Sequence, residues 1–298
     1  MNQMAAVVNP TAGGGRAGGL WKEIAARVPA LAAAHLVRAA QPEAIRRELA
    51  DLIERGVDKV VVLGGDGSMH LVGNAVLDLG RGGDVALGMV PLGTGSDLPR
   101  ALGLPADPTE CAARIVAATP RIIDALEVTT GDGRRRYVLN VASAGISGMV
   151  DEAVNSMPNR GASAYLRATL SALLRYRDVP CRVRLDGEPW YEGGVLLLAI
   201  GNGTSFGRGM QVAPQARLDD GEMDVVLVLP APRWRLAFRL GRLFRGTHLD
   251  TEFVRWRRAR TLELEPLAPL PPFDLDGEVF ASGPARIRVL PGALRMLA

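Results

Sequence analysis

The chain has 298 residues, of which 48% are hydrophobic and 22% are charged. This balance is typical of a globular protein with a sizeable core and excludes long disordered stretches, while the length favours two domains over one. The formal net charge is only +3, and the cations are almost all arginine, which we interpret as genomic composition; the charge gives no indication of a nucleic-acid partner. The two cysteines, Cys111 and Cys181, lack metal or redox spacing, so reduced, buried thiols are expected.

The first part of the chain alternates short β-branched runs with segments of helical periodicity. Strands are expected at 4–8, 35–38, 59–63 and 85–90, and helices at 20–28, 42–54 and 69–79. In the second helix Pro42 suits the first turn, and Ile45, Leu49, Leu52 and Ile53 lie on one side. The alternation predicts an α/β domain with a parallel sheet and flanking helices.

After about Asp124 the sequence changes to strands separated by turn signals, at 131–133, 186–187, 219–221 and 276–277. Helical patterns interrupt them at 163–176 and 234–245. We therefore predict an α/β nucleotide-binding domain over 1–124, with a probable return segment at 286–298, and a β-rich, β-sandwich-like lipid-substrate domain over 125–285. The functional labels of the two domains depend on the resemblance described below.

The sequence predicts no segment that crosses a membrane. The first residues form no secretion signal, and the apolar runs are far shorter than the roughly 20 residues of a spanning helix. A cytoplasmic location is therefore expected.

Glycine-rich loops follow three of the predicted strands: NPTAGGG at 9–15, GGDGS at 64–68 and PLGTGSD at 91–97. The carboxyl ends of parallel strands meet at one edge of a sheet, where open α/β sheets bind ligands. Glycines there let backbone N–H groups approach phosphate oxygens. One such loop could be a simple turn, but three in consecutive βα units indicate a phosphate site. Neither the P-loop pattern nor the Rossmann pattern explains all three glycine-rich loops.

These loops, together with GNGTSFGRGMQVAPQARLDDGEMDV at 201–225 and LDGE at 275–278, resemble the catalytic domain of the diacylglycerol kinase family, which includes bacterial lipid kinases and sphingosine kinases. The GGDG element is shared with NAD kinases, whereas the later elements distinguish lipid kinases. The resemblance implies transfer of phosphate from ATP, with Mg²⁺, to a lipid hydroxyl, most simply that of diacylglycerol. It also implies an NAD kinase-like nucleotide-binding domain.

The resemblance also implies roles for individual residues. Glu278 is expected to be the general base, Asp66 and Asp97 to organise Mg²⁺, and Asp124, an acidic residue near the site, to be a further catalytic residue. A separate structural metal would be held around Asp220. This structural metal would also bind the carbonyl groups of Arg217 and Glu222. The residues expected to contact the nucleotide are Asn9, Gly13, Arg38, Gly64, Gly65, Asp66, Gly67, Ser68, Gly93 and Thr94.

Simpler interpretations exist for several of these residues. Asp276-Gly277 is a good hairpin turn, with Glu278 as a solvated strand residue, and 219–221 is also a turn signal. Asp124 alone could be a charge at the end of a strand. The chain also departs from the family pattern at Arg38, His70, Leu71 and Ser96, which bears on how it uses the nucleotide.

The segment 233–245 combines arginines at helical spacing with Trp234 and several leucines. Such a helix can lie on an anionic membrane, which predicts transient peripheral association, or it can dock on the second domain with a solvated arginine face. Two other functions stay open: a kinase of a soluble acceptor such as NAD, and a non-catalytic nucleotide- or lipid-binding protein. A homodimer is also left open.

Overall fold

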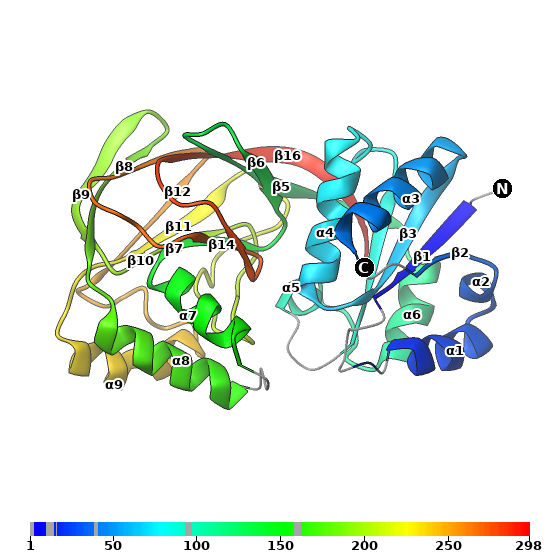
Figure 1. Ribbon diagram of the computed structural model, residues 1–298, viewed down its shortest axis with the longest axis horizontal. Helices are drawn as coiled ribbons and strands as arrows, with labels where there is room; N and C mark the ends of the chain where they lie inside the picture. Colours follow the sequence, from blue (N-terminus) through cyan, green and yellow to red (C-terminus); the bar gives the residue numbers. More distant parts are fainter. Residues whose placement is uncertain (1–2, 10–14, 16, 39–40, 93–96, 158–161) are drawn as a thin grey trace. The chain divides into compact units, whose positions relative to one another are not determined.

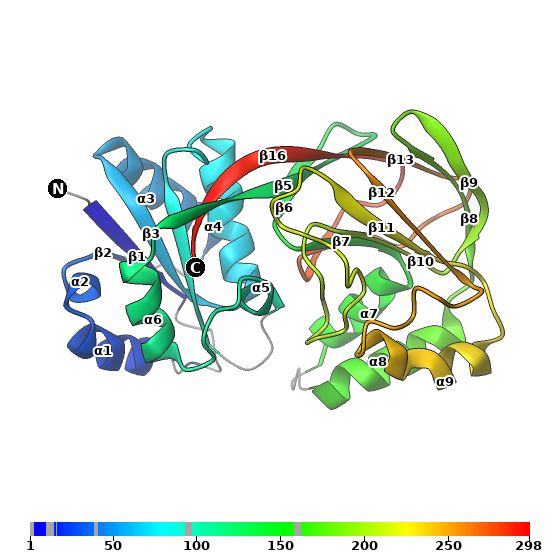
Figure 2. The same ribbon diagram turned by 180° about the vertical axis from the view of Figure 1, so that it is seen from behind.

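The computed structural model describes residues 3–9, 15, 17–38, 41–92, 97–157 and 162–298. The chain forms two compact units (Figure 1 and Figure 2). Unit 1 comprises Met1–Asp124 and Pro291–Ala298, and unit 2 comprises Ala125–Leu290. None of the helices in the described ranges has the length and apolar character needed to span a bilayer.

Unit 1 is built on a parallel sheet of order β2-β1-β3-β4, with the end of β16 beside β4. Its elements are β1 (Gln3–Val8), α1 (Ala17–Arg27), α2 (Pro29–Ala32), β2 (His35–Val37), α3 (Pro42–Glu54), β3 (Val57–Gly64), α4 (Asp66–Asp78), β4 (Ala86–Pro91), α5 (Asp97–Ala101), α6 (Pro108–Ala117) and the last residues of β16 (Ala285–Leu297). The predicted α/β domain with a parallel sheet and flanking helices is confirmed.

The strands of unit 1 are buried on both faces. On one face Val8, Val61 and Val90 share a core with Trp21 of α1 and Ile115 of α6. Successive side chains of a strand point to opposite faces, so the residues between them face the other way, where α3 and α4 lie (Figure 1). Burial on both sides explains why these strands are continuous apolar runs.

Helix α3 spans the predicted 42–54 segment. Pro42 lies in its first turn, and Ile45, Leu49 and Ile53 are buried at four-residue spacing. This spacing gives the helix one apolar side, which packs inward.

The described residues of unit 2 form antiparallel sheets and three helices. Its elements are β5 (Pro120–Thr130, which starts in unit 1), β6 (Arg135–Val138), β7 (Val141–Gly145), α7 (Ile146–Asn155), α8 (Ala162–Arg175), β8 (Val179–Leu185), β9 (Glu188–Val195), β10 (Leu197–Gly201), β11 (Met223–Val228), α9 (Arg233–Leu243), β12 (Val254–Ala259), β13 (Thr261–Pro266), β14 (Phe273–Leu275), β15 (Glu278–Phe280) and the first half of β16. One sheet has the order β12-β11-β10-β7-β14-β15, and in the other β16 pairs with β13, β13 with β8 and β8 with β9. The predicted β-rich second domain is confirmed.

Three of the predicted turns join paired strands: β5 to β6, β8 to β9 and β14 to β15. The fourth, at 219–221, does not do so directly, because a connection from Asn202 to Glu222 separates β10 from β11. The turn signal at 219–221 therefore marks a turn at the end of a long connection between the paired strands β10 and β11, and not a two-residue hairpin. Helix α7 was not predicted at all.

The core of unit 2 combines both sheets. Val128 and Leu262 from one sheet share a cluster with Ala199 and Val226 from the other. Cys111 of unit 1 and Cys181 of unit 2 are buried free thiols, and burial raises the pKa of each to about 11. Both thiols are therefore protonated and unreactive at neutral pH.

Candidate active site

Three strand ends of unit 1 are tied together by hydrogen bonds. The N–H of Asn9, after β1, donates to the carbonyl of Leu63 at 3.4 Å, and the N–H of Leu92, after β4, donates to that of Gly64 at 3.1 Å. The Asn9 amide also donates to the Ser68 hydroxyl at 3.2 Å. The loops that follow these strands therefore leave the sheet at one edge.

The GGDG loop forms the start of α4. The helix begins at Asp66, three residues before the predicted start, so the motif lies in the first turn, at the positive end of the helix dipole. A Cβ atom at Gly64 would lie 2.5 Å from the Ser68 hydroxyl oxygen, which explains the glycine at this position. The loop can therefore bring backbone N–H groups close to an anion.

Asp66 and Asp97 lie together, although 31 positions separate them. The Asp66 carboxylate accepts the N–H of Asp97 at 2.8 Å and that of Leu98 at 3.3 Å, which fixes the start of α5. Asp97 is buried, and its carboxylate pairs with Arg100 at 2.5 Å. Unit 1 thus brings the Asp66 carboxylate to the backbone of Asp97, and each of the two carboxylates is in contact with donors.

The other residues predicted in unit 1 lie in different settings. Asp124 is buried in β5 and accepts the N–H of Gly292 at 2.8 Å, so it fastens β16, where Gly292 has a φ of 62°. Arg38 is exposed just after β2, and His70 is buried on α4. Gly13, Gly93, Thr94 and Ser96 lie outside the described residues.

In unit 2, Glu278 is the first residue of β15 and is exposed. It pairs with Leu275 across a two-residue turn, in which Asp276 and Gly277 have φ values of 57° and 87°. Positive φ at both positions defines a type I′ hairpin, as the Asp-Gly pair predicts.

Asp276 holds this turn in place. Its carboxylate accepts the N–H groups of Leu139, Asn140 and Val141, at 2.9, 2.9 and 3.0 Å. Three charge-assisted bonds fix the hairpin and with it the backbone of Glu278. Sequence reasoning assigned Asp276 only to the turn and missed this anchoring.

Two further carboxyl groups below the hairpin were not predicted. Asp274, in β14, is buried, accepts the N–H of Gly277 at 2.7 Å and accepts the hydroxyl of Ser143 at 3.2 Å. It also hydrogen-bonds Asp151 of α7, which is 7% exposed. Asp274 could have been noticed as an acid beside LDGE, but Asp151 belongs to a helix that the sequence did not reveal.

Burial governs the protonation of this pair. The pKa of Asp151 is raised to about 6 because burial raises it, the hydrogen bond with Asp274 opposes this, and the nearby Glu278 carboxylate adds to the rise. Burial and then the charge of Asp151 raise the pKa of Asp274 well above its usual range. The two carboxyl groups therefore share a proton in mildly acidic solution.

The predicted structural metal site lies just before β11. The Asp220 carboxylate accepts the N–H of Glu222 at 3.2 Å, and its second oxygen is buried without a hydrogen-bond partner among the described residues. Arg217 is exposed, and its side chain pairs with Asp219 at 3.6 Å. A buried carboxylate oxygen without a donor is unfavourable, so this position suits a bound cation. Within the described ranges, no three His, Cys, Asp or Glu side chains are grouped to hold a metal ion.

Comparison with known proteins matches both units. The family model described as "Diacylglycerol kinase catalytic domain" covers residues 3–128, and the one described as "YegS C-terminal NAD kinase beta sandwich-like domain" covers 140–298. A protein of Stenotrophomonas maltophilia (strain K279a), named "Probable lipid kinase YegS-like", is 35% identical over 84% of this chain and 82% of its own length. A Mycobacterium tuberculosis (strain ATCC 25618 / H37Rv) protein named "Diacylglycerol kinase" is 33% identical over 85% of this chain and 80% of its own length.

Solved structures agree in fold. A crystal structure of a diacylglycerol kinase from Bacillus anthracis str. Sterne is similar with a TM-score of 0.74 and 21% identity, over 99% of this chain and 96% of that chain. The chain belongs to the lipid kinase family of diacylglycerol kinase and YegS-like proteins. It is accordingly a kinase of the diacylglycerol kinase-like class.

Proposed function

We propose that this protein transfers the γ-phosphoryl group of ATP to a lipid hydroxyl, converting diacylglycerol to phosphatidate. The observation that carries the proposal is the position of Glu278, an exposed carboxylate on a hairpin that Asp276 anchors with three hydrogen bonds. A general base needs a fixed place and access to substrate, and this hairpin supplies both. The relative named diacylglycerol kinase supports the choice of acceptor.

The nucleotide side of the reaction belongs to unit 1. The GGDGS loop, with Gly64, Gly65, Gly67 and Ser68, offers backbone N–H groups and the helix dipole of α4 to the phosphates. Asn9 stabilises this loop through Ser68. Gly13, Arg38, Gly93 and Thr94 complete the proposed nucleotide contacts.

Asp66 and Asp97 would hold Mg²⁺, since carboxylate oxygens are the ligands that this ion prefers. Their proximity through the 2.8 Å bond from the Asp97 N–H fits such a role. When bound, the ion would offset the charge on the transferred phosphoryl group. Asp124, which accepts the N–H of Gly292 in β16, is retained in this proposal as a further acidic residue of the catalytic site.

A second metal would be structural. It would use the orphaned oxygen of Asp220 together with carbonyl groups of Arg217 and Glu222. Mg²⁺ is then expected to raise the melting temperature of the wild type by more than that of Asp220→Ala, which keeps the proposed Asp66 and Asp97 site.

The proton step follows from these positions. Glu278 takes the proton from the lipid hydroxyl while that oxygen bonds to the γ-phosphorus, and the bond to the bridging oxygen of ADP breaks. The products are phosphatidate, ADP and a protonated Glu278, which returns its proton to solvent. The enzyme would work from the cytoplasm at a membrane surface, where its substrate lies.

The test is transfer of labelled γ-phosphate from ATP to a panel of micellar lipids, with NAD as a soluble control and with magnesium present or chelated. Magnesium-dependent label on diacylglycerol is expected. Label on NAD alone would replace the proposal with a soluble-acceptor kinase, and label on no acceptor would favour a non-catalytic role.

A further inference from the structure

Two neighbouring helices of unit 2, α8 and α9, expose large apolar side chains. The helices contact each other. The exposed fraction of Phe238 is 85%, that of Leu174 is 79% and that of Trp234 is 62%. The other exposed apolar residues on or beside these helices are Leu166, Leu170 and Phe244. Isolated exposed apolar residues are ordinary, but six on two adjacent segments form a patch that indicates an interaction surface.

The outward side of α9 is aromatic. Trp234 and Phe238 are four residues apart and therefore lie on one side of the helix, with their rings edge to face at a centroid distance of 6.4 Å. Leu236, on the other side, is the buried residue of α9. If α9 exposed only arginines to solvent, as in the alternative interpretation, the rings of Trp234 and Phe238 would be buried against unit 2.

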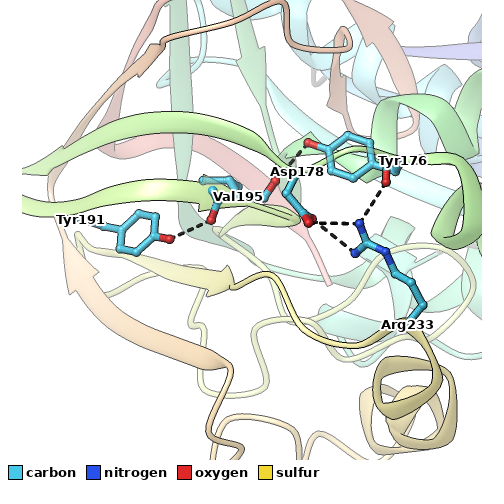
Figure 3. Close-up of polar contacts among 6 residues, drawn as sticks. Tyr176, Asp178, Tyr191, Val195 and Arg233 are labelled. Carbon is cyan, nitrogen blue, oxygen red and sulfur yellow. Dashed lines mark hydrogen bonds and ion pairs between the residues drawn. The ribbon is translucent and has the colours of Figure 1, made fainter.

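Arginines hold α9 in this orientation. Arg233 pairs with Asp178 at 3.1 Å and donates to the carbonyl of Tyr176 at 2.9 Å (Figure 3). The Tyr176 hydroxyl in turn donates to the carbonyl of Val195 at 3.1 Å, which ties this anchor to β9. The start of α9 is thus fixed on the body of unit 2.

The second anchor is Glu252, which pairs with Arg235 at 3.3 Å and with Arg239 at 3.9 Å. These exposed pairs add little stability alone, but they link α9 to Glu252, which lies between α9 and β12. The rings of Trp234 and Phe238 are left on the outward side.

The charged residues of the two helices themselves are all cationic, and the acidic residue beside them, Glu252, is paired with Arg235 and Arg239. Helices α8 and α9 contain six arginines and no Asp or Glu. Arg242 and Arg245 are exposed near the end of α9, and the guanidinium of Arg235 lies 5.3 Å from the centre of the Trp234 ring. Aromatic rings bordered by arginine suit the boundary between lipid headgroups and acyl chains, where anionic lipids attract the cations.

We propose that this α8/α9 face, defined by Leu166, Leu170, Leu174, Trp234, Phe238, Phe244, Arg242 and Arg245, docks on an anionic phospholipid bilayer. Trp234 and Phe238 enter the interface, and Arg242 and Arg245 bind the headgroups. The inference builds on the proposed lipid kinase function by giving unit 2 a surface that reaches the acceptor's membrane.

The experiment is co-flotation of the full chain, without ATP, with vesicles of phosphatidylcholine alone or of equimolar phosphatidylcholine and phosphatidylglycerol. The wild type should bind the anionic vesicles, and Trp234→Ser/Phe238→Ser should lower the partition coefficient by about tenfold or more. Arg242→Gln/Arg245→Gln should reduce the preference for anionic vesicles and the sensitivity of binding to salt.

A matched control replaces exposed apolar residues of unit 1. Leu79 and Ile122 are 42% and 61% exposed, so Leu79→Ser/Ile122→Ser removes apolar surface elsewhere and should bind like the wild type. Trp234→Phe keeps an apolar ring and should also bind, while the vesicle-induced blue shift of tryptophan emission should be largely lost.

Equal vesicle binding by the wild type and Trp234→Ser/Phe238→Ser would overturn the proposal, as would absence of wild-type binding. A change of oligomeric state in the double variant, with vesicle binding intact, would instead assign the face to a second copy of the chain. Because flotation needs no catalysis, it is independent of the proposed reaction. On a water-dispersed short-chain diacylglycerol the double variant should keep the wild-type rate, so loss of vesicle binding with retained soluble turnover is the expected pattern.

Discussion

The tetrapeptide Leu-Asp-Gly-Glu occurs twice in unit 2, at 185–188 and at 275–278. Both copies form the same hairpin: the leucine pairs with the glutamate, and the Asp and Gly both have positive φ. In both, the Asp carboxylate accepts backbone N–H groups from another part of the chain. The local sequence and the backbone geometry therefore do not distinguish the two turns.

Their surroundings do distinguish them. Asp186 is exposed and accepts two N–H groups, from Arg260 and Thr261, and the Thr261 hydroxyl at 3.4 Å. Asp276 is half-buried and accepts three, and Asp274 lies beneath its turn, hydrogen-bonded to Asp151. The surroundings thus set the 275–278 copy apart, and the 185–188 copy is an internal control for it.

The largest effect in this comparison is expected from Asp276→Ala. In this variant three N–H groups lose a charged acceptor, so the free energy of unfolding of unit 2 should fall by about 4 kcal/mol. This corresponds to a fall of about 8 to 16 °C in melting temperature. Displacement of Glu278 should also reduce turnover about 10²-fold. Thermal unfolding and kcat measure the two effects.

Asp186→Ala is the control, since it changes the same residue type at the same φ. The exposed site should lose less stability, and turnover should stay at the wild-type level. Equal losses in the two variants would show that the turn itself, and not its surroundings, carries the effect.

The next largest effect is the dependence of stability on pH, which arises from the buried carboxyl pair Asp151 and Asp274. The folded-state pKa of Asp151 is raised to about 6, so the folded protein holds a proton that the unfolded chain releases above about pH 4. The stability contributed by this proton is complete below the unfolded pKa and is lost as the pH rises through 6. Asp151→Asn mimics the protonated form and should be more stable than the wild type by about 2 to 3 kcal/mol at pH 7.5.

Melting curves between pH 4 and pH 8 check this prediction, because the advantage of Asp151→Asn should disappear near pH 4. Glu152→Gln, at the exposed neighbouring position on α7, should follow the wild type throughout. An advantage that does not change with pH would contradict the shared proton.

The smallest effect is expected from Ser143→Ala. Ser143 is fully buried, and its hydroxyl donates to Asp274 at 3.2 Å. Loss of one such bond costs about 1 to 2 kcal/mol, and the pKa of Asp274 should rise further. Urea unfolding at neutral pH measures the change, and a variant as stable as the wild type would mean that this bond contributes nothing to holding β14.

The sequence predicted the elements whose signal is local. Helix α3 follows from Pro42 and the spacing of Ile45, Leu49 and Ile53, and the hairpin at 276–277 follows from its Asp-Gly pair. The sequence did not predict α7, which directly follows β7 and contains Gly148. There the carbonyl of Pro272 would lie 2.2 Å from a Cβ, so tertiary contact and not helix propensity explains the glycine.

The sequence predicted which residues belong to the candidate site, but it did not predict the contacts that those residues make. The contact between Asp66 and Asp97 spans 31 positions, and the bonds of Asp276 to 139–141 span more than 130. Such contacts depend on how strands assemble, which local patterns do not report. The Asp151–Asp274 pair was missed for the same reason, because one partner lies on the unpredicted helix.

The most direct test of the proposed mechanism compares Glu278→Gln with Glu188→Gln, the same change in the two Leu-Asp-Gly-Glu hairpins. The measurement is single-turnover transfer of labelled γ-phosphate from ATP to diacylglycerol, with melting temperatures as a check on folding. Glu278→Gln should lower the transfer rate by about 10² or more with an unchanged melting temperature, and Glu188→Gln should match the wild type. A wild-type rate for Glu278→Gln would contradict its role as general base, and equal losses in both variants would contradict the assignment of the site to the 275–278 hairpin.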